Sequence, residues 1–290
     1  QESRTDQAGA VFLSKAGISG KGSIAFFRKL QGQEFRLAIP QDNEYARTHP
    51  LSSTRVANLI AVYEKDPAWN TPPDKALQAK FERIKGKLIG FVEEPPRVMQ
   101  QYPEGTNTAA ALYARAYAWH RSGHPDQAMT EAARLVALNP YDPYYLELEG
   151  QILLESGKIA DSLPVLRRAV ERAPFEPMII TLLGHALVTS EDSTLQAEAE
   201  PLLRKAVSLD RENPFTWYQL GVIYDRRGDK PRAALAAAER FSLEGNAMGA
   251  MMNARLARAG LPAGTPDFIR ADDIMLVAGD ALERQKRKKR

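Results

Sequence analysis

The stretch from Pro140 to Pro174, PYDPYYLELEGQILLESGKIADSLPVLRRAVERAP, contains one complete unit of a repeating pattern. Two segments with apolar residues at helical spacing flank Gly157, and a proline stands at each end. The same landmarks recur with one constant spacing in the pairs Gly123/Gly157, Pro140/Pro174 and Gly150/Gly184. Three independent landmarks at one period predict a stack of helical repeats rather than a single globular core.

Each landmark has a physical role in a pair of helices. Glycine ends the first helix, a small residue lets the two helices cross closely, and proline starts the next connection. Together with the 34-residue period, these features resemble the tetratricopeptide repeat. The alternative is a generic helical bundle whose alanines and leucines merely satisfy the period of 3.6 residues. The shared spacing favours the repeat, and we expect an all-α superhelix of tetratricopeptide type.

Alignment on these landmarks gives four units. The first three cover 109–141, 143–176 and 177–213, and the third needs about three extra residues in its turn, near Ser190. The fourth unit matches the repeat's aromatic, Leu-Gly, aromatic, Gly and Ala positions with Trp217, Leu220, Gly221, Tyr224, Gly228 and Ala233. The chain therefore contains about 135 residues of repeat.

A stack of this kind curves so that the first helix of each pair lines its concave face. In tetratricopeptide proteins that face commonly holds a peptide or a segment of another protein. The candidate groove residues on the predicted first helices are Tyr113, Tyr117, His120, Tyr144, Gln151, His185 and Tyr218. Each of these side chains could instead pack between repeats. We expect a protein or peptide partner in the groove.

The composition excludes several classes of function. The 290 residues include no cysteine, which excludes disulfides, cysteine-ligated zinc and thiol catalysis. No run approaches the roughly 18 apolar residues of a membrane span, so no transmembrane segment is expected. The tail at 284–290 holds six of the 39 basic side chains. The rest of the chain has 33 basic and 36 acidic side chains. The net charge of +3 thus comes from a tail, and we expect no nucleic-acid partner.

The N-terminal segment, 1–63, does not follow the repeat. Glu2 and Asp6 form an E-x-x-x-D pattern on a predicted helix. This pattern is followed by the segments AGAVFLSKAGISG and AFFRKL. Thr-His-Pro-Leu at 48–51 comes next, and then Arg55-Val56. In this order, the pieces resemble the end of a gluzincin peptidase domain. The similarity is to bacterial periplasmic zinc metallopeptidases that carry tetratricopeptide repeats and act in outer-membrane protein quality control.

The resemblance implies roles for four residues. Glu2 would be the third zinc ligand, and Asp6, one helical turn later, would orient the metal site by hydrogen bonding. His49 would match the histidine of the family's His-Pro loop near the metal, and Arg55 would match the arginine after that loop. The resemblance also implies a periplasmic location.

The chain departs from the family in one respect. It contains no H-E-x-x-H, and its four histidines offer no two that could replace the missing pair. Zinc hydrolysis needs two imidazoles, a carboxylate ligand and a general base. We therefore expect the C-terminal, protein-binding portion of a longer zinc metallopeptidase. Zinc would belong to the full-length protein, while this chain alone would bind none tightly and cleave no peptide. The groove could hold the protein's own peptidase domain. The alternative is a free-standing tetratricopeptide scaffold or adaptor with no peptidase role.

These patterns divide the chain into four parts. They are 1–63, the end of the peptidase domain; 64–107, a helical connector; 108–245, four repeats; and 246–290, capping helices with a basic tail. The connector contains an amphipathic helix whose apolar stripe is Leu77, Phe81, Ile84, Leu88 and Phe91. Because a flexible linker would not carry so long a stripe, we expect this helix to dock the peptidase part onto the repeats.

Overall fold

The computed structural model describes residues 2–36, 52–190 and 192–289, and in these ranges all regular structure is helical. The chain divides into two compact units, Gln1–Glu82 and Arg83–Arg290, and the boundary falls inside one helix, α4 (Lys75–Val92). Each unit is described by itself.

The first unit is a small helical cluster. It contains α1 (Glu2–Lys15), α2 (Lys21–Arg36), α3 (Ser52–Tyr63) and the short 3-10 helix η2 (Pro67–Asn70). Its buried core consists of Ala10, Ile24, Val56, Leu59 and Tyr63. A side chain at Gly20 would lie 2.1–2.4 Å from ring atoms of Tyr63, so the turn between α1 and α2 packs directly on α3.

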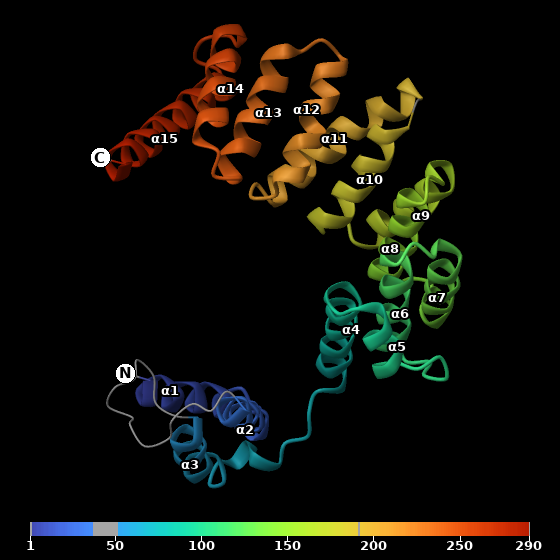
Figure 1. The fold of residues 1–290 in the computed structure, drawn as a ribbon, viewed down its shortest axis with the longest axis vertical. Helices are drawn as coiled ribbons and strands as arrows, with labels where there is room; N and C mark the ends of the chain where they lie inside the picture. The colour runs from blue at the N-terminus through green and yellow to red at the C-terminus, as the bar shows by residue number, and fades with distance from the viewer. Residues whose placement is uncertain (1, 37–51, 191, 290) are drawn as a thin grey trace. The chain divides into compact units, whose positions relative to one another are not determined.

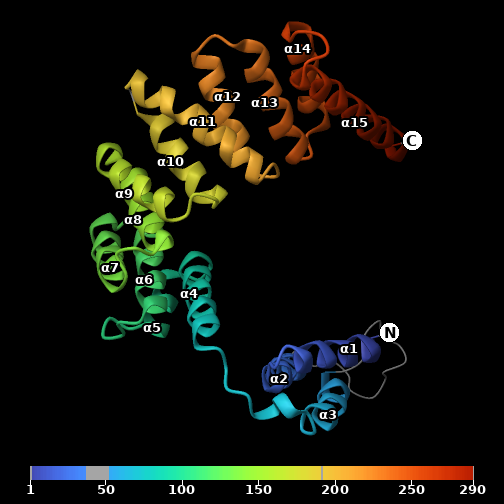
Figure 2. The same cartoon turned by 180° about the vertical axis from the view of Figure 1, so that it is seen from behind.

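The second unit is a stack of helix pairs (Figures 1 and 2). After α4 it contains α5 (Pro95–Gln101), α6 (Ala109–Arg121), α7 (Pro125–Leu138), α8 (Pro143–Glu155), α9 (Ile159–Arg172), α10 (Pro177–Thr189), α11 (Ser193–Leu209), α12 (Pro214–Arg226), α13 (Lys230–Leu243), α14 (Ala247–Gly260) and α15 (Pro266–Lys289). The pairs α6/α7, α8/α9, α10/α11 and α12/α13 each pack together, which confirms the all-α tetratricopeptide expectation. We call the surface formed by α6, α8, α10 and α12 the first-helix face.

Two kinds of connection alternate along the stack. Within the first, second and fourth pairs, a glycine in the left-handed region closes the turn, as at Gly157 with φ 79°, where the N–H of Lys158 donates to the carbonyl of Leu153 at 2.9 Å. Between pairs, Asp142 caps α8 by accepting from the N–H of Tyr144 at 2.9 Å, and a proline follows at the first helical position. This alternation produces the 34-residue period.

Two of the glycine landmarks, Gly150 and Gly184, mark close helix crossings within the second and third pairs. A side chain at Gly150 would lie 2.4 Å from Leu166, and one at Gly184 would lie 2.5 Å from Leu203. Both leucines are fully buried. The small residue therefore allows the leucine of the second helix to pack against the backbone of the first.

The third pair differs from our expectation in detail. Its second helix, α11, has 17 residues, whereas α7 and α9 have 14. The extra residues lengthen the start of this helix instead of widening its turn. Asp192 stabilises the early start, because its carboxylate accepts from the N–H of Thr194 at 2.8 Å.

The regular alternation ends after α13. At Gly245, with φ 73°, the N–H of Asn246 donates to the carbonyl of Phe241 at 2.8 Å, which is the turn found within pairs. As a result, α14 packs back on α13 in the way that the second helix of a pair packs on the first. The core that α13, α14 and α15 share includes Leu235, Ala238, Ala250, Ala254, Ala257, Ala271, Ile274 and Ala278. The flank of α12 that would face the next first helix in a regular stack is therefore left open.

Candidate functional site on the first-helix face

Helix α4 lies on the first repeat by means of two glycines. Side chains at Gly86 and Gly90 would each lie 2.4 Å from a backbone carbonyl oxygen of α6, those of Ala110 and Ala114. Their four-residue spacing puts both on one side of α4. The backbones of α4 and α6 are therefore in direct contact, as the two ribbons drawn side by side in Figures 1 and 2 show.

Polar contacts attach α4 to the first two pairs. Arg83 donates to Asp142 at 2.9 Å, and Lys87 donates to Glu147 of α8 at 3.4 Å. From α6, Arg121 donates to the carbonyl of Glu93 at 2.9 Å. The C-terminal half of α4, from Arg83 onward, is thus attached at its start, its middle and its end.

Tyr113 and Tyr117, two of the predicted groove residues, are buried beneath α4. Their rings stack with centroids 5.8 Å apart, and the Lys87 ammonium lies 6.0 and 5.9 Å from them. The hydroxyl of Tyr113 donates to the carbonyl of Tyr144, and that of Tyr117 donates to Gln151 Oε1. Burial raises the pKa of both tyrosines. Both side chains are packed between α4 and the repeats.

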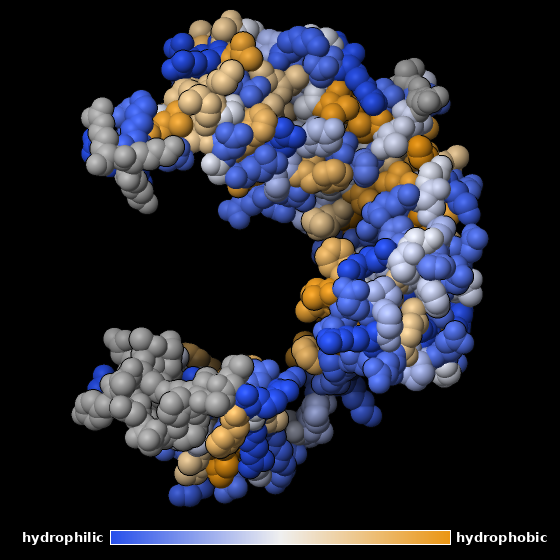
Figure 3. Space-filling view, in the orientation of Figure 1, coloured by the Kyte–Doolittle hydropathy of each residue, from blue (hydrophilic) through white to orange (hydrophobic). Residues whose placement is uncertain are grey.

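The apolar stripe of α4 points away from this contact. Ile84, Leu88 and Phe91 are 61%, 60% and 59% exposed, on the side opposite the two glycines. Figure 3 shows hydrophobic side chains at the position of α4. We expected the apolar stripe to pack against the repeats. Instead, the side of α4 that carries Gly86 and Gly90 packs against α6. The Phe91 and Tyr117 rings form a T-shaped pair with centroids 6.1 Å apart, so the stripe borders the first-helix face.

Farther along the same face, three aromatic side chains form a ladder. The ring centroids of His185 on α10 and Phe215 on α12 are 5.1 Å apart, and those of Phe215 and Tyr218 are 6.3 Å apart. Phe215 and Tyr218 are exposed, and the guanidinium of Arg240 lies 5.3 Å from the Tyr218 ring. Two predicted groove residues, His185 and Tyr218, thus lie in an accessible part of the face.

A groove of about 650 Å³ opens beside Tyr218, where the flank of α12 is uncovered. Gly221 and the alanines 233, 234 and 237 supply small residues to its lining, and Leu256 of α14 lies on the other side. Small residues allow close approach of an incoming chain. The groove follows from the turn at Gly245, which the sequence reading did not use.

His120, another predicted groove residue, is part of a polar cluster. Its Nε2 lies 2.5 Å from Glu155 Oε2, and Gln151 donates to the other oxygen of that carboxylate at 2.8 Å. These hydrogen bonds, that of His120 first, lower the pKa of Glu155. The cluster joins α6 to α8 across the first-helix face.

The pH dependence of stability should show the burial of His185. Burial lowers the pKa of this histidine, so between its folded and unfolded pKa values the unfolded chain binds more protons. Its contribution to the free energy of unfolding should be complete above about pH 6.5 and be lost as the pH falls below that value. We expect His185→Gln to flatten the dependence between pH 5 and 7, measured by urea denaturation. His124→Gln, in an exposed turn, serves as the control, and an equal slope in both variants would contradict the assignment.

In the first unit, Asp6 and Arg55 form a bidentate ion pair. Arg55 Nε and Nη2 donate to the two carboxylate oxygens at 2.8 and 2.7 Å, and the guanidinium lies 4.2 Å from the Phe27 ring. The structure thus joins Asp6, which the family resemblance expects to orient the metal site, to the arginine that follows the His-Pro loop. His49 and the side chain of Glu2 lie outside the described residues. Their roles stay predictions.

The described residues by themselves do not fit a zinc site. Both oxygens of Asp6 accept hydrogen bonds from Arg55, and the described ranges contain no cluster of three or more metal-ligating side chains. A zinc ion would need the undescribed carboxylate of Glu2 and the two imidazoles of an H-E-x-x-H helix, a motif that the sequence lacks. Within the same ranges, no helix has the length and apolar character that a membrane crossing requires.

The sequence predicted that α4 docks on the repeats, but not that its side chains contact the groove residues. Arg83, Lys87 and Phe91 lie against the rings of groove tyrosines, yet they stand outside the repeat and share none of its spacing. The four-residue spacing of Gly86 and Gly90, which is typical of close helix contact, indicated close packing of this helix but not which side chains it would bring to the groove.

Comparison with known proteins gives one curated relative of note. No family model matches the chain. The "Beta-barrel assembly-enhancing protease" of Yersinia pestis is 25% identical over 249 residues, which are 84% of this chain and 50% of that protein. The chain therefore spans about half the length of the curated relative it matches.

Solved structures with a similar fold are tetratricopeptide and MamA proteins. YrrB, titled "a TPR protein with an unusual peptide-binding site", is 18% identical with a TM-score of 0.47, covering 63% of this chain and 97% of its own. MamA from Desulfovibrio magneticus RS-1 is 17% identical with a TM-score of 0.45, covering 62% and 98%. The repeat assignment rests on the helix pairs and the 34-residue period described above.

Proposed function

We propose that this tetratricopeptide chain, related over most of its length to a protease, binds hydrophobic segments of incompletely folded proteins. The binding surface is the exposed stripe of α4 together with the aromatic ladder of α10 and α12. The partner's apolar side chains would pack on the stripe, and its backbone would lie along the first-helix face.

The observation that carries this proposal is the exposed stripe on a firmly attached helix. Ile84, Leu88 and Phe91 present three large apolar side chains to solvent at i, i+4 and i+7. Contiguous exposed apolar surface of this kind marks interaction sites. Because Gly86 and Gly90 hold α4 against α6, the stripe is already in place before a partner arrives, which lowers the entropic cost of binding.

The double substitution Ile84→Asp/Leu88→Asp should weaken binding of an unfolded protein at least tenfold. Two carboxylates in an apolar contact lose their hydration without gaining partners. Reduced, carboxymethylated lactalbumin, labelled with a fluorophore, is a permanently unfolded probe whose binding to the full chain is measured by anisotropy. Tyr218→Ser, which removes one ring of the ladder, should weaken binding less.

The matched control is Leu276→Asp/Val277→Asp, which makes the same change at two exposed positions of α15. We expect the control to bind as the unmodified chain does. Equal affinity of the two double variants would overturn the proposal, and so would an unmodified chain that does not bind the probe.

For the parent protein we propose a zinc metallopeptidase of the bacterial periplasm that acts in quality control of envelope or outer-membrane proteins. The E-x-x-x-D and His-Pro patterns support this proposal, as does the similarity to half of a protease. The test is to read the coding sequence upstream of the codon for Gln1. An H-E-x-x-H helix encoded there supports the peptidase, and its absence favours a free-standing scaffold.

A further inference from the structure

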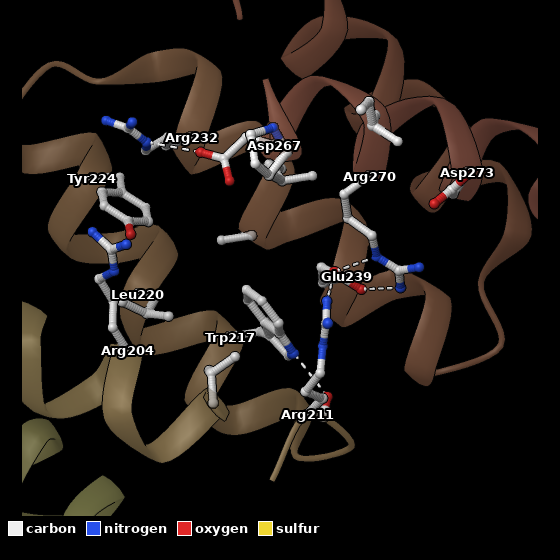
Figure 4. Close-up of a pocket in the computed structure, with 15 residues that line it drawn as sticks. Arg204, Arg211, Trp217, Leu220, Tyr224, Arg232, Glu239, Asp267, Arg270 and Asp273 are labelled. Atoms are coloured by element: carbon white, nitrogen blue, oxygen red, sulfur yellow. Dashed lines mark hydrogen bonds and ion pairs between the residues drawn. The ribbon is translucent and has the colours of Figure 1, made fainter. Parts of the chain in front are cut away.

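A second cavity lies on the other side of the fourth pair, between α11, α12, α13 and α15 (Figure 4). Its volume is about 560 Å³, within the range of ligand pockets. Trp217 lines both this cavity and the groove beside Tyr218, and it stands between them. We call this cavity the arginine pocket.

The floor of the arginine pocket is apolar. It is formed by Val207, Trp217, Leu220, Tyr224, Leu235 and Ala236. The indole N–H of Trp217 donates to the carbonyl of Arg211 at 2.9 Å, which holds the ring in place. An aliphatic or aromatic side chain of a ligand would lose contact with water on this floor.

The rim carries more guanidinium than carboxylate groups on the α11 side. The buried Glu239 accepts two hydrogen bonds from Arg270, at 2.7 Å each, and also lies 3.4 Å from Arg211. One carboxylate therefore serves two guanidiniums, and because Arg270 is bound in a bidentate manner, Arg211 has the weaker share.

The same imbalance recurs at Glu200. Its carboxylate is shared by Arg227 and Arg204, and the latter is 3.7 Å away. Arg204 and Arg211 are both exposed at the mouth of the pocket. On the opposite side, Arg232 is bound to Asp267 at 3.0 Å and also to Asp229, so its charge is matched. The excess positive charge thus lies at Arg204 of α11 and at Arg211, just after the end of that helix.

We propose that the arginine pocket binds a peptide carboxylate with a bulky apolar side chain beside it. The carboxylate accepts hydrogen bonds from Arg204 and Arg211, because charge-assisted pairs of this kind are strong and directional. The neighbouring apolar side chain fills the floor around Trp217. This site is separate from the first-helix face, so one partner could contact both surfaces.

The probe is the blocked pentapeptide Ac-Gly-Asp-Leu-Glu-Gly-NH₂, titrated into the full chain. The indole N–H resonance of Trp217 reports binding in ¹H–¹⁵N spectra, and it is assigned by substituting Trp69 and Trp119 with phenylalanine. We expect this resonance to shift with the peptide. A peptide with Asn and Gln in place of the acids, or with Gly in place of Leu, should bind at least tenfold more weakly.

A fourth peptide distinguishes the source of the carboxylate. Ac-Gly-Asn-Leu, with a free C-terminus, carries its only charge on the main chain. Tighter binding of this peptide would assign the pocket to chain termini, whereas tighter binding of the pentapeptide would assign it to acidic side chains. Failure of both to shift the Trp217 resonance would overturn the proposal.

The protein variant that tests the rim is Arg204→Gln/Arg211→Gln. Both side chains are exposed, and we expect affinity for the tighter peptide to fall at least tenfold. The matched control, Arg97→Gln/Arg167→Gln, removes the same charge from exposed positions on α5 and α9 and should bind normally. Equal affinity of the two variants would contradict a role for the rim.

Discussion

Replacing Arg115 with alanine should lower the free energy of unfolding by about 3–5 kcal/mol. This arginine of α6 is 0% exposed and donates to Glu131 Oε2 of α7 at 2.8 Å. Its Nη1 also donates to the carbonyls of Tyr102, Pro103 and Thr106 at 3.3, 3.0 and 2.9 Å. The substitution would remove the shorter of the two ion pairs of the buried Glu131, whose other partner, Arg134, lies 3.3 Å away, and it would leave three carbonyls without this donor.

Urea denaturation followed by far-UV circular dichroism measures the effect. The control is Arg97→Ala, which removes an exposed arginine 3.7 Å from Glu93 and should cost less than about 1 kcal/mol. Glu131→Gln keeps a hydrogen-bond acceptor for Arg115 and should cost less than Arg115→Ala. A loss below about 1 kcal/mol for Arg115→Ala would show that the buried network does not stabilise the first pair.

Alanine at Gly86 or Gly90 should destabilise the chain by about 1–3 kcal/mol at each position. In a helix, replacing glycine with alanine ordinarily stabilises by about 0.5–1 kcal/mol, so the expected sign is reversed. The reason is the space available. At both positions the new methyl group would lie 2.4 Å from a carbonyl oxygen of α6, and backbone atoms cannot move aside as a side chain can.

Gly9→Ala and Gly32→Ala provide matched controls, because these helical glycines have no atom within 4 Å of the new methyl group. Both controls should be neutral or stabilising. Thermal denaturation measures all four variants, and amide hydrogen exchange tests whether α4 separates from α6 in the double variant Gly86→Ala/Gly90→Ala. Unchanged exchange in α4 together with unchanged stability would show that the helix is not held by its glycines.

The repeat could be predicted because its signals are local. Gly157 and Pro140 act on the backbone of their own turn, so the 34-residue period directly reports a series of helix pairs. The candidate site was predicted less completely. The period identifies the helix that carries Tyr113, Tyr117, His185 or Tyr218, but it does not report what covers each side chain.

For that reason the predicted groove residues have different surroundings. Tyr113 and Tyr117 are buried beneath α4, a helix outside the repeat, while His185 and Tyr218 lie in the ladder. In the third pair, too, the sequence pattern did not determine the local structure. The extra residues were visible in the sequence, but whether they widened the turn or lengthened α11 depended on the cap at Asp192.

By itself, the sequence determined the helical class, the pairs and the positions of their turns, because glycine, proline and capping side chains act within a few residues of themselves. Only the tertiary structure decided which side of α4 faces the repeats. The hydrophobic stripe and the two glycines both offered a packing surface, and the choice depended on how closely the backbone of α6 could approach. The same is true of Arg115, whose burial becomes favourable only when Glu131 and three carbonyls from a separate loop surround it.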